Sequence, residues 1–174
     1  SEMCIRDSNN SIAFNAQNLR ANIDLSDREG VFYSNGSGSY VTFPASEYIS
    51  YIDKLKWEMD KEQLTFGEKE LNNSKGSKFI SLNSDQDSLS FIASSADYSL
   101  KDFIINAHGV DSLNIADAVI FPDSGELIVE RGARIRTLNN SSLLLDPLIR
   151  YHSFNNATID ISSANKYSAS ADYV

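Results

Sequence analysis

Residues 96–145 alternate short runs of β-branched and aromatic residues with turns made of Asp, Asn, Ser and Gly. No segment between these turns carries the apolar period of a helix over a helix-like length. Short runs of this kind, bounded by turn formers, are typical of antiparallel strands joined by tight turns. The stretch therefore predicts an all-β architecture, and it contains no motif that names a reaction.

The composition allows a packed domain and narrows the range of partners. The chain of 174 residues is 41% hydrophobic and 22% charged, which supplies a core and is too little charge for a disordered polyampholyte. The net charge is −9 and the 15 Lys and Arg residues are scattered, so the clustered positive charge that binds phosphate backbones is missing. We therefore expect neither nucleic acid nor an anionic membrane surface as a partner.

The N-terminal residues look foreign to the rest of the chain. Met3-Cys4-Ile5-Arg6-Asp7-Ser8 resembles the conceptual translation of a transposon sequencing adaptor, and we expect residues 1–8 to be a scar that is not native. Cys4 is the only cysteine, so we expect the native segment to lack disulfides, thiolate metal sites and cysteine nucleophiles. Residues 171–174 resemble an interrupted strand, so we expect a fragment that is truncated at its C-terminus.

The predicted strands divide the rest of the chain into two lobes. Residues 9–71 form the first β lobe, residues 72–78 a polar linker or loop, and residues 79–174 the second β lobe. In the second lobe we predict a strand on each side of the turn at 83–88, and a last hairpin over residues 157–173.

Two segments of the first lobe allow more than one interpretation. Residues 35–38, Asn-Gly-Ser-Gly, resemble a phosphate-binding loop but lack the Lys and the helix that should follow, so we predict a hairpin turn. In residues 46–63 the apolar spacing fits a helix as well as strands. Because apolar and charged residues alternate from Leu55 onward, we predict a hairpin over residues 54–67, with a short helix over residues 46–54 as the alternative.

One short pattern occurs twice. Ala21-Asn22-Ile23-Asp24-Leu25-Ser26 matches Ala157-Thr158-Ile159-Asp160-Ile161-Ser162 at four identical positions, and a looser third copy starts at Ala96. A hairpin cannot bury its apolar face alone, so such units are expected to stack and to share a core. We predict stacked strand-turn-strand repeats, as in a β-solenoid or an open, β-taco-like β-jelly roll.

Two groups of residues have the chemistry of a metal site but not its spacing. His108 and His152 are 44 positions apart, and turn or surface positions are the expectation for both. Asp85 and Asp87 imitate the start of a calcium-binding loop, yet the Gly and Glu that such a loop requires are replaced by Ser90 and Ala96. We assign no metal site and no cofactor.

Acidic and aromatic residues are the usual components of a polysaccharide-binding or polysaccharide-cleaving site. Carboxylates that act on a glycosidic bond stand roughly 5–9.5 Å apart, and the candidates are Asp97, Asp117, Asp160 and Asp172. A sugar-stacking platform has as its candidates Trp57, Tyr48 and Tyr51. Strand ends and core packing are the expected roles of these residues, so we assign no catalytic residue.

A resemblance to known proteins rests on three segments: Gly30-Val31-Phe32-Tyr33-Ser34-Asn35-Gly36, Leu55-Lys56-Trp57-Glu58-Met59-Asp60, and Gly109-Val110 with Ile115-Ala116-Asp117-Ala118 and Pro122. They are similar to segments of large, uncharacterised bacterial cell-envelope proteins. The strand rhythm also resembles the organic-solvent-tolerance (OstA-like) repeats of lipopolysaccharide-transport proteins, which form an open, stacked β-jelly roll with an apolar groove.

The resemblance implies a non-enzymatic scaffold or conduit for an amphiphile such as lipopolysaccharide, in the periplasm or at the outer membrane. It also implies contact with other envelope proteins through sheet edges, and it assigns no ligand-binding residue. Two alternatives stay open: a polysaccharide-active β-helix enzyme and the stalk of a surface adhesin. A conduit requires a continuous apolar groove, the enzyme requires carboxylates and aromatics gathered in a cleft, and a stalk has a filled interior and a polar exterior.

Overall fold

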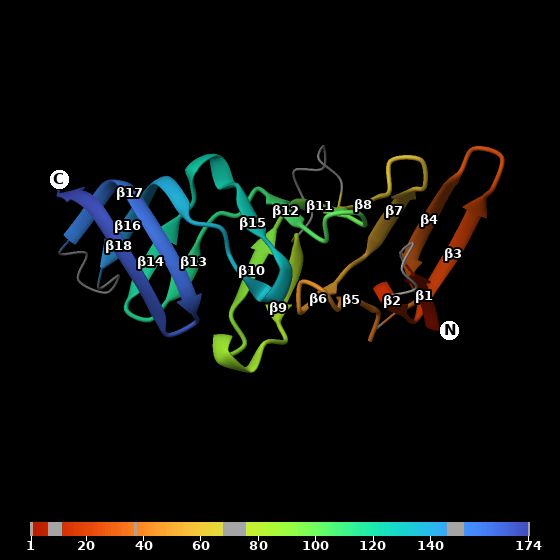
Figure 1. Ribbon diagram of the computed structural model, residues 1–174, viewed down its shortest axis with the longest axis horizontal. Coiled ribbons are helices and arrows are strands. Elements are labelled where there is room, and N and C mark those ends of the chain that lie inside the picture. The colour runs from red at the N-terminus through yellow and green to blue at the C-terminus, as the bar shows by residue number, and fades with distance from the viewer. Residues whose placement is uncertain (1, 7–11, 37, 68–75, 146–151, 174) are drawn as a thin grey trace.

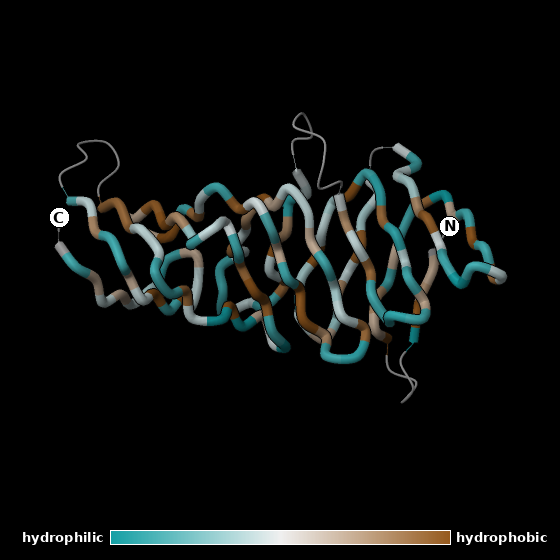
Figure 2. The backbone as a smooth tube through the Cα atoms, turned by 90° about the horizontal axis from the view of Figure 1, so that it is seen from above, coloured by the Kyte–Doolittle hydropathy of each residue, from teal (hydrophilic) through white to brown (hydrophobic). Residues whose placement is uncertain are grey.

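The protein is an elongated all-β molecule with the N- and C-termini at opposite ends (Figure 1). The computed structural model describes residues 2–6, 12–36, 38–67, 76–145 and 152–173. Within these residues every regular element is an antiparallel strand or a 3-10 turn, which confirms the all-β prediction. The backbone runs back and forth across the long axis (Figure 2).

The strands form three sheets. The first sheet contains β1 (Glu2–Arg6), β2 (Ile12–Gln17), β5 (Tyr40–Phe43), β6 (Tyr48–Tyr51), β9 (Ser77–Ser81) and β10 (Ser90–Ala93), hydrogen-bonded in that order. The second sheet contains β15 (Leu127–Val129), β12 (Ile105–His108), β11 (Ser95–Ser99), β8 (Gln63–Phe66), β7 (Lys54–Glu58), β4 (Glu29–Ser34) and β3 (Leu19–Asp24). The third contains β13 (Leu113–Ile115), β14 (Ala118–Phe121), β16 (Leu138–Leu145), β17 (His152–Ser163) and β18 (Lys166–Tyr173). The 3-10 turns are η1 (Ser84–Gln86), η2 (Asp123–Gly125) and η3 (Arg131–Ala133).

Successive strand pairs alternate between the first two sheets. The β5–β6 and β9–β10 pairs lie in the first sheet, and the β3–β4, β7–β8 and β11–β12 pairs lie in the second. Within each sheet, the last strand of one pair is hydrogen-bonded to the first strand of the next pair, as β2 is to β5 and β4 is to β7. The two sheets are therefore built up together along the long axis, and their inner faces enclose a common core.

This alternation overturns the predicted hairpin turn at residues 35–38. β4 pairs with β3 and β7, whereas β5 pairs with β2 and β6. The segment between β4 and β5 therefore carries the chain from the second sheet to the first and closes no hairpin. Gly36 and Gly38 adopt φ values of 104° and 89°, which favour glycine and let the backbone change direction here.

The ambiguous segment at residues 46–63 is β-structure. The predicted hairpin over residues 54–67 is confirmed as the β7–β8 pair, and the alternative helix over residues 46–54 is replaced by β6. The strands predicted on both sides of residues 83–88 form the β9–β10 pair, and the last hairpin forms as β17–β18.

Strands from the two predicted lobes pair with each other. Most of the predicted linker, residues 72–75, lies outside the described residues, and Ser77 and Lys78 begin β9. β6 pairs with β9 in the first sheet, and β8 pairs with β11 in the second. Both lobes therefore contribute to the same sheets and to a single cluster of buried apolar side chains.

Aromatic rings join the two sheets in the middle of the core. Phe43 of the first sheet lies 5.4 Å from Phe66 and 4.6 Å from Tyr98 of the second sheet, measured between ring centroids. Phe79 extends this group along the first sheet, and its ring stacks on that of Phe91 at 5.1 Å. Each of these rings is buried, so the interior between the sheets is filled here.

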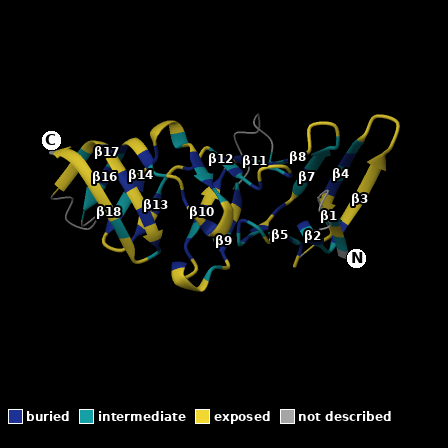
Figure 3. Ribbon diagram, in the orientation of Figure 1, coloured by how far each residue is buried: buried dark blue, intermediate teal, exposed yellow. Residues whose placement is uncertain are grey.

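The two copies of the repeated pattern have different surroundings. The second copy lies in β17 between β16 and β18, where Ile159 is fully buried and Ile161 is 6% exposed. The first copy lies in and just after β3, the edge strand of the second sheet, where Ile23 is 45% exposed and Leu25 is 77% exposed. Exposed residues follow β3 along most of its length (Figure 3). The same pattern is thus buried where a further strand flanks it and exposed where none does.

The segment that resembles an adaptor takes part in the fold. β1 pairs with β2 through five residue pairs, and the side chains of Met3 and Ile5 pack against the core. A segment can join a sheet edge when its backbone N–H and C=O groups are free and its side chains alternate between the core and the solvent. The edge of β2 thus accepts a strand.

Two buried tyrosines make the stability of the fold depend on pH. Burial raises the pKa of Tyr48 and of Tyr98 above the ordinary value of 10.0, because the phenolate is poorly solvated in the core. A raised pKa in the folded state means that the unfolded chain loses these protons first, so stability is fully present below pH 10 and falls above it. We expect unfolding experiments to show a loss of about 2 kcal/mol between pH 9 and pH 10.5, summed over both groups.

The double variant Tyr48→Phe/Tyr98→Phe is the control for this prediction. It keeps both rings and removes both hydroxyls, so the alkaline loss of stability should become much shallower than in the parent protein. An equally steep loss in the double variant would show that other groups govern the alkaline transition.

Candidate functional site

The best candidate site is a slot of about 700 Å³ along one long edge of the molecule, between the first and second sheets. Its apolar lining comes from both sheets and from the turns between their strands: Ile5, Ile12, Ala13, Ala45, Trp57, Met59, Leu100 and Phe103. Its charged lining consists of Arg6, Arg28, Lys101, Arg131 and Glu62. We call this cavity the basic slot.

Basic residues outnumber acidic ones in the lining of the basic slot. The protein as a whole carries a net charge of −9, yet Arg6 of the adaptor-like segment and Arg28, Lys101 and Arg131 of the remaining chain line the slot, against Glu62 alone. The Arg28 side chain is paired with Asp60. The guanidinium carbon of Arg131 lies 4.1 Å from the centre of the Phe103 ring, in cation–π geometry. This contact fixes a positive charge beside an apolar surface.

Hydrogen bonds between distant segments hold the slot in place. The buried Tyr98 hydroxyl donates to the Ala13 carbonyl at 3.0 Å and ties the second sheet to the first. The Ser46 hydroxyl donates to the Phe103 carbonyl at 2.8 Å, and the Gly132 N–H donates to the Ala45 carbonyl at 2.9 Å. The walls of the slot are thus formed before any ligand binds.

The sugar-stacking platform considered from the sequence does not form. Tyr48 is fully buried, whereas Tyr51 lies on the other side of β6 and is 49% exposed. Trp57 of β7 is partly buried, packs against the core and lines the basic slot. Its indole Nε1 is buried and finds no acceptor among the described residues. Trp57 therefore belongs to an apolar site and not to an exposed aromatic surface.

His108 lies on the outer side of β12 between two carboxylates. Its Nδ1 is 2.7 Å from a Glu126 oxygen and its Nε2 is 3.3 Å from an Asp97 oxygen, while the Thr65 hydroxyl donates to Asp97 at 3.0 Å. The sequence did not indicate this cluster, because Asp97 reaches His108 from β11 and Glu126 reaches it from the segment between η2 and β15. His152 belongs to β17 of the third sheet. In the part of the chain that the structure describes, no group of three or more His, Cys, Asp or Glu side chains is arranged to hold a metal ion.

Asp85 and Asp87 belong to a turn. Asp85 lies in η1, where its backbone N–H donates to the side chain of Asn83 at 2.9 Å. Asp87 ends the turn in the left-handed conformation, and its carboxylate accepts from the Asn165 amide at 3.3 Å. The acidic pair thus has a local structural role.

The four carboxylates considered for glycoside chemistry are distributed over separate parts of the molecule. Asp97 lies on the second sheet beside His108, and Asp117 accepts from the Tyr167 hydroxyl at 3.4 Å in the turn after β13. Asp160 of β17 accepts from Thr137, and Asp172 of β18 accepts from Asn156 at 3.4 Å. Asp160 pairs with Ser168, four positions from Asp172, so the backbone positions of the two residues are offset by about 13 Å along the strands. This spacing exceeds that of a catalytic pair, roughly 5–9.5 Å.

No local feature of the sequence predicts the basic slot. Lys101 and Arg131 lie in turns that are far apart in the chain and meet only in the fold. Several turns of the chain contain a basic residue, but the sequence does not show that these turns lie on the same side of the molecule.

Comparisons with known proteins leave the chain without an assigned family. No protein-family model matches it, and no curated protein matches it either. Among the described residues there is no helix long and apolar enough to span a membrane.

Proposed function

We propose that this chain is a non-enzymatic scaffold of the bacterial cell envelope that binds an anionic amphiphile in the basic slot. The observation that carries the proposal is the pairing of an apolar lining with Lys101 and Arg131 in a protein of net charge −9. An alkyl chain would cover the apolar residues, and an anionic head group would meet the basic ones. The envelope location rests on the resemblance to envelope proteins.

The filled core favours a scaffold that has a binding slot and disfavours a continuous conduit. A single buried apolar cluster runs from Ala13 in β2 to Ile161 in β17. A channel for acyl chains would need an open apolar path along this axis, and the side chains of the core occupy that space. The slot opens on the edge of the molecule and lies beside the core.

A stalk or spacer role is the second candidate. It is supported by the elongated shape, by the termini at opposite ends (Figure 1) and by the alternation of strand pairs between two sheets. It is also supported by the exposed apolar residues Ile23 and Leu25 at the β3 edge, which further strands of a stacked, repetitive fold would cover. In this role neighbouring segments or envelope proteins would add strands to the sheet edges.

Trp57 makes the amphiphile proposal directly testable. It is the only tryptophan of the chain and it lines the basic slot. We expect dodecyl phosphate, added below its micelle concentration, to change the Trp57 emission saturably. We expect dodecyl maltoside, which has the same alkyl chain and no charge, to bind at least about tenfold more weakly, because it leaves the basic residues without an anion.

Charge-matched variants separate the slot from the net charge. Lys101→Gln/Arg131→Gln should weaken dodecyl phosphate binding about tenfold or more, whereas Lys166→Gln/Arg134→Gln, which lies outside the slot and changes the net charge equally, should leave it within about twofold. If both double variants weakened dodecyl phosphate binding equally, the detergent would be attracted by the net charge and not by the slot. If neither double variant changed the affinity, the proposal would be refuted.

A further inference from the structure

A second cavity lies where the regular pairing of strands is interrupted. As a rule, the last strand of one pair is hydrogen-bonded to the first strand of the next pair in the same sheet. This holds for β2–β5 and β6–β9 in the first sheet, for β4–β7, β8–β11 and β12–β15 in the second sheet, and for β14–β16 in the third. By this rule β10 should pair with β13. Instead, β10 is the edge of the first sheet and β13 is the edge of the third.

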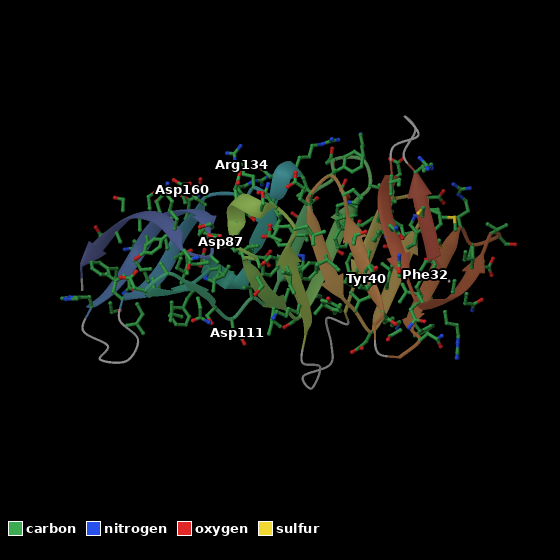
Figure 4. All side chains as sticks on the ribbon, turned by 90° about the horizontal axis from the view of Figure 1, so that it is seen from below. Phe32, Tyr40, Asp87, Asp111, Arg134 and Asp160 are labelled. Carbon is green, nitrogen blue, oxygen red and sulfur yellow. The ribbon has the colours of Figure 1, made fainter. Side chains whose placement is uncertain are left out.

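A groove of about 610 Å³ takes the place of the missing pairing. It is lined by residues of β10, of β13 and of the segments next to them: Gly76, Lys78, Ser88, Ser90, Phe91, Ile92, Ser94, Gly109, Asp111, Ser112, Asn114 and Ala164. Most of these side chains are small or polar, and β10 and β13 each have one side without a strand partner. Figure 4 labels Asp111 of this groove at the border of the molecule opposite Asp160. We call this cavity the edge groove.

Hydrogen bonds close both ends of the edge groove. At one end the Ser94 hydroxyl donates to the Gly109 carbonyl at 3.3 Å. At the other end Ala164 bridges the two sheets, since its N–H donates to the Gln86 carbonyl at 3.0 Å and its carbonyl accepts from the Ala116 N–H at 2.8 Å. The length left between these ends matches β10, which has four residues and spans about 13 Å.

The walls of the groove also carry opposite charges. Lys78 lies on β9 directly beside Ile92 of β10, and Asp111 lies just before β13. Neither side chain has an ion-pair partner within the described residues. The buried Phe91 ring contributes to the lining between these walls. The groove thus combines free backbone groups, one charge of each sign and one apolar contact.

We propose that the edge groove binds an extended peptide segment, which pairs antiparallel with β10 and faces β13 on its other side. Its backbone would use the free N–H and C=O groups of β10, as in other cases of strand addition. An acidic side chain of the peptide would approach Lys78, a basic one would approach Asp111, and an apolar side chain between them would turn inward to Phe91. This site is separate from the basic slot, so it does not depend on the proposed function.

The probe is the acetylated and amidated peptide Glu-Val-Lys, whose length fits between the closed ends of the groove, and its binding to the full chain is followed by amide NMR. We expect saturable shifts confined to residues 88–94 and 109–114, and slower hydrogen exchange of β10 amides. The same peptide with N-methyl groups on its Glu, Val and Lys amides should not bind, because it cannot donate to the strand edge. Ser112→Trp, which fills the groove, should weaken binding at least tenfold, and the control Ser153→Trp on β17 should not.

Each other outcome overturns the proposal. Binding of the N-methylated peptide that equals that of the parent peptide would rule out strand addition even if Ser112→Trp fails to fold. Shifts at the β3 or β18 edges would place the peptide elsewhere. Shifts that follow protein concentration without peptide would mean that a second copy of the chain occupies the groove, and no shift at millimolar peptide would mean that the groove is not a peptide site.

Discussion

Replacing Phe43 with alanine is expected to lower the free energy of unfolding by about 3–5 kcal/mol. The Phe43 ring is fully buried and contacts Phe66 and Tyr98 across the interior between the first and second sheets. Because its neighbours come from both sheets and are themselves closely packed, they cannot collapse into the space that the ring leaves. The loss therefore combines the lost apolar contacts with a cavity.

Urea unfolding, followed by circular dichroism and by Trp57 emission, measures this effect. The matched control is Phe121→Ala, which removes the same ring from β14 at a position that is 41% exposed. It should cost about 1 kcal/mol or less, since little packing is lost there. If the two variants were equally destabilised, the rings around Phe43 would not form the shared core of the two sheets.

Local pattern was sufficient to predict individual strand pairs. The β7–β8, β9–β10 and β17–β18 pairs follow from apolar alternation on both sides of a polar turn, because these signals act over adjacent residues. The pattern does not state which sheet the next strand joins. The segment between β4 and β5 has the composition of a hairpin turn, yet it crosses between sheets, because the partners of β5 are set by β2 and β6.

The two cavities depend on that long-range topology. Lys101 and Arg131 meet because turns on the same side of several strand pairs line up along one edge. The edge groove exists because β10 and β13 do not pair. Neither cavity has a short sequence motif. The candidates that the sequence offers, His108 and the acidic residues, have a chemistry that is visible without the fold, and no site was assigned to them.

Backbone crowding also leaves no signal in the sequence. Gly67 follows β8 with a φ of 74°, and a Cβ atom at this position would lie 2.4 Å from the Ser94 carbonyl oxygen. Only glycine fits such an approach between backbone segments that are distant in the chain. The composition marks Gly67 as a turn former, but only the fold shows what it faces.

Gln86→Leu is expected to destabilise the protein by about 2–4 kcal/mol, although leucine has a similar size and greater hydrophobicity. Gln86 is 6% exposed, its side-chain amide donates to the Ala133 carbonyl at 2.6 Å, and its side-chain carbonyl accepts from the Tyr48 hydroxyl at 3.4 Å. Its backbone carbonyl accepts from Ala164 in the turn of the third sheet. Leucine would leave the Ala133 carbonyl buried without its donor, at a cost of about 1–3 kcal/mol. It would also remove one of the two side-chain partners of the Tyr48 hydroxyl, the other being Ser81.

A double-mutant cycle tests whether these hydrogen bonds cause the loss. Tyr48→Phe removes the hydroxyl that donates to Gln86, so the double variant should be more stable than the sum of the two single effects predicts, by about 0.5–1.5 kcal/mol. Additive effects would mean that Gln86 and Tyr48 stabilise the fold independently. A neutral Gln86→Leu variant would show that the side-chain amide of Gln86 does not stabilise the contact between Tyr48 of the first sheet and Ala133 of η3.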